Sequence, residues 1–465
     1  AAAEQIMPAI TQAKELPNQV FALSAAVNTS IKNFPTVRAA RYKVQAARAD
    51  VTLARTAYLP RFDLLTQQLV TTTNVVQGAI MPQMMDVLPV QSGREQSANS
   101  MKGLFGANLG SNFNWLIYDF GLRGANVGLA RAQQRFADAN VRLTELDVAY
   151  DTADLYLQTV ANIETIRAQL ATVERMQAAA ITAHTLVDTG MRAGVDAALA
   201  DYELSQSKIR LYEAQRNAEL SRVDLAESMG LAGNFIGVTA EPLVSSPDRT
   251  VFVAKLIPQS HPLLQVHQAA VSTEAARVHV QDRAYFPKVY MSSILWGRGS
   301  GARGVQTPLA AGILPNVANY AVGVTVNFPT LDIFEIRARK RHAQADERAE
   351  RANFDLAVQI LEQKDARAKV LLNESRRIAD ETPIMVNAAR ENQIKTLERY
   401  NVGLSDMVAV AQAERMLAQA EVENAIAQVQ VWRAILSAAY VQGDLKPFLN
   451  LVKLAERRAH SGVTQ

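Results

Sequence analysis

Six histidines are the side chains best suited to hold a metal or to act as an acid or base: His184, His261, His267, His279, His342 and His460. None belongs to an HExxH motif, and none stands at metal-ligand spacing from carboxylates. The sequence therefore predicts scattered surface histidines. Cysteine is absent, which excludes disulfides, thiolate metal sites and a cysteine nucleophile.

Two other patterns suggest chemistry only weakly. The glycines between residues 297 and 304 overlap a dinucleotide-binding pattern, but no helix follows and no acidic residue stands about 20 positions further on. Met81, Met84 and Met85 form a thioether cluster of the kind that suits Cu(I). An external loop explains each pattern better. We therefore predict no catalytic residue, no cofactor and no metal site, and a protein that is not an enzyme.

Composition narrows the classes of protein that remain. The 465 residues carry 48 Lys and Arg against 45 Asp and Glu, a formal charge of +3, so a nucleic acid partner is not expected. Hydrophobic residues make up 49% but aromatic residues only 6%, because much of the apolar content is alanine. This is typical of long, closely packed helices. No stretch reaches the roughly 18 apolar residues of a membrane-spanning helix.

An internal duplication organises the chain. Pro35 and Pro262, and likewise Pro60 and Pro287, are 227 residues apart. Further along, residues 118–120 pair with residues 331–333 at an offset of 213, so the first copy has the longer connection. We expect a first repeat over 1–230, a linker over 231–260, a second repeat over 261–440 and a tail over 441–465.

Each repeat contains a very long helix and a second helix joined by a glycine turn. Apolar residues recur every three or four positions in a near-heptad seam, which predicts helices over 122–189 and 334–400. Each would span about 100 Å at 1.5 Å per residue, and Pro383 should kink or break the second. The turns are predicted at 190–195 and 401–405, and the returning helices at 196–229 and 406–440.

Strands are predicted at 62–74, 108–118, 289–298 and 320–328. Apolar and uncharged polar residues alternate over 108–118 and 320–328, a pattern typical of transmembrane barrel strands, while 62–74 and 289–298 alternate less cleanly. A sheet on a soluble core is the alternative. The expected lipid-facing residues are Leu109, Phe113, Trp115, Ile117, Val322, Val324, Val326 and Phe328. Four strands cannot close a wall, and an open edge in lipid leaves backbone groups unpaired. Three copies would give twelve strands and a twelve-helix tube.

The order of these features resembles a known family. Tyr58-Leu59-Pro60, the segment 115–123, the turn 400–405 and the duplication together look like a TolC-type outer-membrane efflux protein, over roughly residues 23–445. The resemblance implies a homotrimer with a β-barrel in the outer membrane of a Gram-negative bacterium. An α-helical tunnel would cross the periplasm, and the linker and both termini would form a mixed equatorial region.

The resemblance also implies the function: a passive, gated exit duct of a tripartite efflux or type I secretion system. A periplasmic adaptor protein would dock it onto an inner-membrane pump of RND or ABC type, which drives transport. The sequence leaves open whether drugs, metals or proteins are carried. A soluble, elongated coiled-coil scaffold is the alternative.

On this interpretation the glycine turns are the periplasmic tips. Gly194 and Gly403 are expected to permit the two reversals. The adaptor would dock at Arg192, Gly194, Val195, Gly403, Leu404 and Ser405. The expected gate residues are Asp196, Asp201, Arg399, Tyr400 and Asp406. Aspartates repeated around a narrow pore attract cations, although Asp196 and Asp406 also suit helix N-caps.

Overall fold

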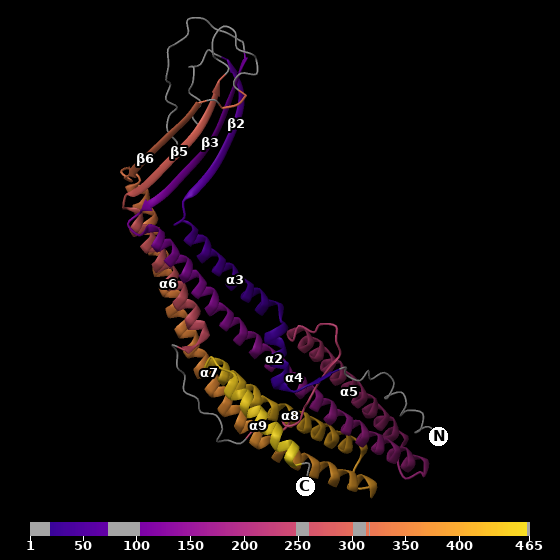
Figure 1. The fold of residues 1–465 in the computed structure, drawn as a ribbon. Coiled ribbons are helices and arrows are strands. Elements are labelled where there is room, and N and C mark those ends of the chain that lie inside the picture. Colours follow the sequence, from indigo (N-terminus) through magenta and orange to yellow (C-terminus); the bar gives the residue numbers. More distant parts are fainter. Residues whose placement is uncertain (1–18, 73–102, 248–259, 301–312, 316, 463–465) are drawn as a thin grey trace. The chain divides into compact units, whose positions relative to one another are not determined.

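The computed structural model describes residues 19–72, 103–247, 260–300, 313–315 and 317–462. One repeat runs α3–β2–β3–α4–α5, and the second repeats this order as α6–β5–β6–α7–α8, as predicted (Figure 1). The elements are β1 (Gln19–Phe21), α2 (Leu23–Asn33), α3 (Pro35–Thr56), β2 (Arg61–Thr72), β3 (Gly103–Tyr118), α4 (Leu122–Asp188), α5 (Gly194–Ser228), β4 (Ile236–Val238), α6 (Pro262–Ala284), β5 (Lys288–Ser300), β6 (Val317–Asn327), α7 (Ile333–Asn401), α8 (Met407–Val441) and α9 (Lys446–Gly462).

The chain forms two compact units that cut across the repeats. One contains the described parts of residues 46–135 and 270–350, and the other those of 1–45, 136–269 and 351–465. Each unit takes segments from both repeats, because the long helices pass from one unit into the other. The boundaries predicted near 230 and 260 therefore separate repeats and not compact units.

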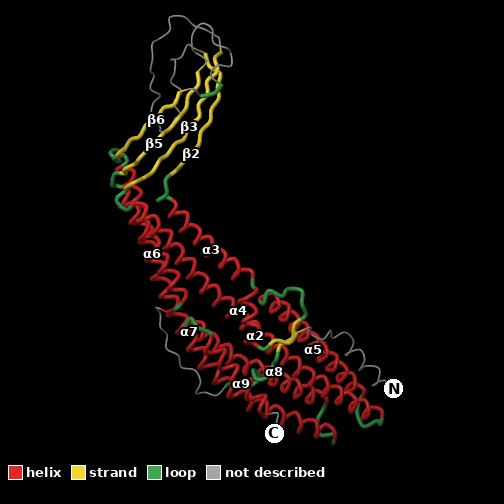
Figure 2. The backbone as a smooth tube through the Cα atoms, viewed as in Figure 1, coloured by secondary structure: helices red, strands yellow, loops and turns green. Residues whose placement is uncertain are grey.

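The first unit contains a four-stranded antiparallel sheet in the order β2-β3-β5-β6 (Figure 2). Strand β3 begins five residues earlier than predicted, and β6 ends at Asn327, so Phe328 lies just beyond it. The central pairing of β3 with β5 joins the two repeats, and a bulge lies between Leu116 and Tyr118.

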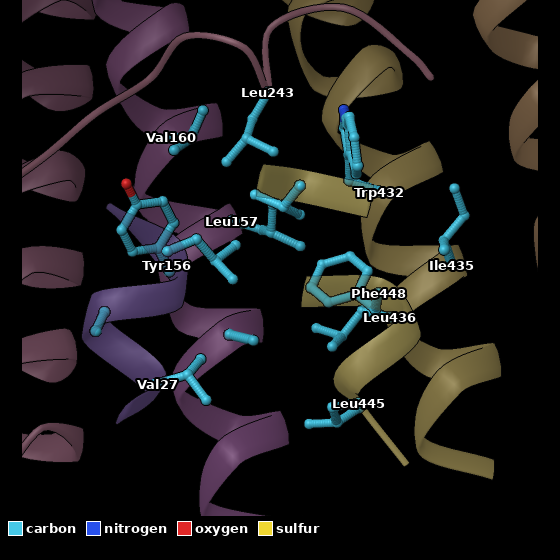
Figure 3. Packing of buried hydrophobic residues seen from close by; sticks show 14 of the residues in the cluster. Val27, Tyr156, Leu157, Val160, Leu243, Trp432, Ile435, Leu436, Leu445 and Phe448 are labelled. Carbon is cyan, nitrogen blue, oxygen red and sulfur yellow. The ribbon is translucent and has the colours of Figure 1, made fainter. Parts of the chain in front are cut away.

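The second unit is held by a core of large buried side chains from both repeats (Figure 3). Trp432 of α8 and Phe448 of α9 pack edge to face, with ring centroids 6.4 Å apart. The Trp432 indole N–H donates to the carbonyl of Ser245 at 2.8 Å. Tyr156 of α4 is also buried, and its hydroxyl accepts the Thr239 N–H at 3.0 Å beside the short parallel pair β1–β4. These polar tips are satisfied, so the aromatic rings can be buried.

Of the two outcomes predicted for Pro383, a kink or a break of the helix, the break does not occur. The helix continues from Ile333 to Asn401 with this proline inside it. A proline lacks the N–H that would bond the carbonyl four residues earlier, here that of Ala379. The side-chain amide of Gln428, on α8, donates to that carbonyl at 3.0 Å. A neighbouring helix thus supplies the missing donor.

His261 is buried, so the prediction of scattered surface histidines is wrong at this position. It stands directly before α6, where its Nδ1 accepts the Leu263 N–H at 3.1 Å. Its Nε2 lies 3.1 Å from the carbonyl of Tyr440 and donates to it. Burial lowers the pKa of His261, and the ring is a satisfied neutral cap.

Candidate functional site at the hairpin tips

Both hairpins end in the same backbone turn. In the first, the N–H groups of Gly190 and Met191 donate to the carbonyls of Val187 and Leu186. In the second, those of Gly403 and Leu404 donate to Tyr400 and Arg399. This pair of hydrogen bonds is the Schellman motif, in which one residue adopts the left-handed backbone conformation. Gly190 and Gly403 take that position with φ of 75° and 85°.

The prediction that Gly194 permits the first reversal is wrong. Gly194 is the first residue of α5, and the left-handed residue is Gly190. The repeat itself carried the signal: Gly190 and Gly403 are 213 residues apart, the offset already found for this part of the chain. Gly194 lies four residues off that register.

The two predicted aspartate caps differ. Asp406 is the N-cap of α8, and its carboxylate accepts the Ala409 N–H at 2.9 Å. Asp196 is not a cap, because the N-cap of α5 is Ala193. The Asp196 carboxylate instead lies 3.5 Å from the Tyr400 hydroxyl, which donates to it. Asp196 therefore links the first hairpin to the second.

Arg192 makes the stronger link between the tips. Its guanidinium donates to the carbonyls of Tyr400 at 2.8 Å and Ser405 at 2.6 Å. It also lies over the Tyr400 ring, 4.6 Å from the centroid, in cation–π geometry. Tyr400 is fully buried, and burial followed by the nearby Asp196 charge raises the pKa of its phenol. We call Arg192, Asp196, Tyr400 and Ser405 the tip latch.

The other predicted gate residues lie outside this latch. Arg399 is exposed, and no contact of its side chain with the first hairpin is described. Asp201 is also exposed and pairs with His184, whose Nε2 is 3.0 Å from its carboxylate, within the α4–α5 hairpin.

Four apolar side chains remain exposed at the tips. Their exposed fractions are 67% for Met191, 69% for Val195, 70% for Val402 and 70% for Leu404. Of the predicted docking residues, Val195 and Leu404 belong to this set, whereas Arg192 is engaged in the latch. The sequence reasoning missed Met191, although it stands 213 residues before Leu404 at the equivalent position of the turn.

A partly buried ionic layer joins the same four helices. Arg175 of α4 pairs with Glu414 of α8 at 3.1 Å and with Glu421 at 2.9 Å. Gln393 of α7 donates to Glu414 at 2.6 Å, and Arg415 of α8 pairs with Glu203 of α5 at 3.0 Å. Glu414 is 2% exposed, and burial raises its pKa although Arg175 opposes this. Sequence spacing offered no signal for these pairs, because their partners lie on different helices.

In the sheet, strand register places the predicted lipid-facing residues together. Paired residues of an antiparallel sheet share a face. The rows Phe113–Ser293–Val322 and Trp115–Met291–Val324 therefore continue one apolar face, and Phe62 joins it opposite Phe113. Val322, Val324, Val326 and Phe328 are exposed. That lipid covers this face stays a prediction.

The recurring segment after β3 locks the strand to its helix. Asp119 is buried, and one carboxylate oxygen accepts both the Arg123 N–H at 2.7 Å and its Nε at 3.0 Å. The Arg123 guanidinium also donates to the carbonyl of Ile117 and lies 4.6 Å from the Tyr58 ring centroid. Trp115 donates from its indole to the Tyr58 carbonyl at 3.0 Å. These contacts join Tyr58 to the segment 115–123, the two parts of the chain that carried the resemblance.

One family model matches the first part of the chain. Residues 26–231, which include the first repeat with its latch arginine, match the model described as outer membrane efflux protein. This first part of the chain is therefore an outer membrane efflux protein domain. No curated protein matches it significantly in sequence. The predictions of an efflux exit duct and of an outer-membrane location reaching into the periplasm are confirmed, and the scaffold alternative is not favoured.

Solved structures of outer-membrane channels share the fold of this chain. CusC is 13% identical with a TM-score of 0.75, over 92% of this chain and 93% of CusC. VceC from Vibrio cholerae is 15% identical with a TM-score of 0.70, over 91% and 96%. The outer-membrane channel OprN is 21% identical with a TM-score of 0.69, over 90% and 89%. The predicted fold class is confirmed.

The family and its solved relatives are channels and not enzymes. Among the described residues, no group of three or more His, Asp or Glu side chains is placed to hold a metal ion. The Met81, Met84 and Met85 cluster lies outside the described residues. Gly297 and Gly299 lie within β5. No described helix is both long and apolar enough to cross a membrane.

Proposed function

We propose that three copies of this efflux protein assemble into one channel, each contributing its four strands to a shared wall. The observation that carries this is the sheet itself. Among the described strands, β2 and β6 each pair on one side only, while the face bearing Val322 and Val324 is apolar and exposed. An unpaired edge in hydrocarbon costs several kcal/mol per group, and pairing β2 of one copy with β6 of the next removes that cost.

The duct acts by gated diffusion and catalyses no reaction. An inner-membrane pump supplies the energy, and a periplasmic adaptor connects it to the hairpin tips. The exposed Met191, Val195, Val402 and Leu404 support docking there, because apolar side chains gathered at one end of a helical pair are a common partner surface.

The tip latch keeps the duct closed. Opening requires the α7–α8 hairpin to move away from α4–α5, so Arg192 must release two carbonyls and the Tyr400 ring. These contacts are few and lie at the helix ends. An adaptor that binds the tips can therefore shift the equilibrium from the closed duct to the open one. Asp196 and Asp406, repeated in three copies, would give the narrow end a cation preference.

Membrane fractionation followed by planar-bilayer recording tests the channel. We expect the protein in the outer-membrane fraction and small, stepwise, cation-preferring currents from the purified protein. Recovery in the soluble fraction without pore activity would contradict the proposal.

Disulfide trapping tests the wall, because these 465 residues contain no cysteine. Thr66→Cys on β2 is combined in turn with Cys at 318, 320, 322 and 324 on β6. One pairing should give trimers on a non-reducing gel. Leu109→Cys with Val322→Cys is the control, because both neighbours of β3 are strands of its own chain. Cross-links in the control alone, or in no pairing, would argue against this wall.

A further inference from the structure

The start of α7, where β6 leads into the helix, carries four basic residues within five positions: Arg337, Arg339, Lys340 and Arg341. Two of them are neutralised: Arg339 pairs with Glu335, and Lys340 lies 2.6 Å from Asp282. Arg337 and Arg341 are exposed, and no ion pair is described for either. They stand four residues apart and so share one face of the helix.

Further positive charge lies at the same ends of the neighbouring strands. Arg61 begins β2 and is exposed, and Lys288 begins β5. The acids in this region that form no described ion pair are Asp63 and Asp332. The junction between sheet and helices therefore has a net positive charge.

Large apolar side chains lie between this charge and the apolar sheet face. Phe328 is 62% exposed, Leu331 79% and Phe334 69%. Phe334 stands three residues before Arg337, on the same face of α7. Exposed apolar side chains followed by arginines are typical of a membrane interface, where the rings enter the acyl region and the guanidinium groups reach the phosphates.

A cavity of about 170 Å³ opens at this junction. Lys288 and Arg339 line it together with Phe286 and Asn327, and Asp332 and Glu335 form its acidic part. Lys288 offers an ammonium to a phosphate there, and the carboxylates can accept hydrogen bonds from a hydroxylated head group.

We propose that the junction of β6 and α7, through Arg337, Arg341 and Lys288, binds anionic phospholipid head groups of the leaflet around the helix-proximal strand ends. The inference rests on the membrane placement of the sheet proposed above. The contacts position the channel at a defined depth and favour anionic over zwitterionic lipid.

Native mass spectrometry of the purified full chain in detergent tests this, with phosphatidylglycerol and phosphatidylcholine as competing probes. We expect the wild type to retain more phosphatidylglycerol. In R337Q/R341Q the bound ratio should fall about fivefold per removed charge at low salt, since each basic side chain at such a surface contributes about a factor of five. R337K/R341K should restore the preference.

The control is R367Q/R377Q, which removes the same charge from exposed positions at least 26 residues further along α7, about 39 Å of helix. An equal fall in the control, an unchanged ratio in R337Q/R341Q, or no preference in the wild type would each overturn the inference. Bilayer conductance of the same samples reports separately on the channel, so failure of the two proposals is distinguishable.

Discussion

Arg192 holds Tyr400 at two points: it donates to the tyrosine carbonyl at 2.8 Å and lies 4.6 Å from the centroid of its ring. A side chain of the first hairpin thereby fixes the last turn of α7, which leads into the second tip. The carbonyl of Ser405, across that turn, accepts from the same nitrogen. One residue therefore couples both tips.

The first prediction concerns the latch. Arg192→Gln removes the charge that binds two carbonyls and the ring, so it should raise the resting conductance in planar bilayers severalfold. Arg399→Gln is the matched control, because it removes the same charge from an exposed side chain at the second tip. Equal effects of both variants would mean that charge alone, and not the latch, controls the conductance.

The second concerns cation preference. Asp196→Asn removes a charge and weakens the contact with the Tyr400 hydroxyl, whereas Asp406→Ser removes a charge but keeps an N-cap oxygen for Ala409. The double variant should shift the reversal potential in a salt gradient toward zero. If the reversal potential is unchanged, both residues are structural only.

The third concerns the tip glycines. Gly190→Ala forces a side chain into the left-handed region and should cost about 1 kcal/mol, seen as a lower thermal unfolding midpoint in detergent. Gly194→Ala, in the first turn of α5, should not lower it, because alanine favours a helix. The opposite ranking would contradict the turn assignment.

The fourth concerns Pro383. Gln428→Leu leaves the buried Ala379 carbonyl without its donor and should destabilise the protein by about 1–3 kcal/mol. In a Pro383→Ala background the restored N–H can bond that carbonyl within the helix, so the same substitution should cost less. Thermal unfolding of the wild type, the two single variants and the double variant gives the coupling energy between Pro383 and Gln428. If Gln428→Leu lowers the stability equally in both backgrounds, Gln428 does not act by replacing the hydrogen bond that Pro383 lacks.

A fifth prediction concerns pH. The pKa of His261 is lowered in the folded state, so below the unfolded pKa of about 6.5 the unfolded chain binds more protons. The stability contributed by neutral His261 is present above that pH and is lost as pH falls toward the folded pKa. Tyr440, Lys364 and Asp147 surround the ring.

His261→Asn keeps an acceptor for the Leu263 N–H without a titrating group. Its unfolding midpoint should fall less than that of the wild type between pH 7.5 and 5.5. The other histidines are present in both proteins, so their contributions to the pH dependence cancel in the comparison. Parallel midpoints would exclude His261 as the source.

The sequence by itself determined the elements and their order. The periods of two and of three to four residues report which side of an element is apolar, so α4 and α7 were predicted to within a residue at each end. The duplication predicted that these elements occur twice. Such patterns are local, and each can be seen along one segment of the chain.

Only the tertiary structure decided which distant residues meet. Arg192 and Tyr400 are 208 residues apart, and Gln428 and Ala379 lie on different helices. Phe62 joins the apolar face because register pairs it with Phe113. Spacing along the chain contains no information about these pairs, since helix packing and strand register arise from contacts between segments. Pro383 shows the consequence: its local preference is to break a helix, yet α7 continues, and an amide from a neighbouring helix bonds the carbonyl that the proline leaves without a donor.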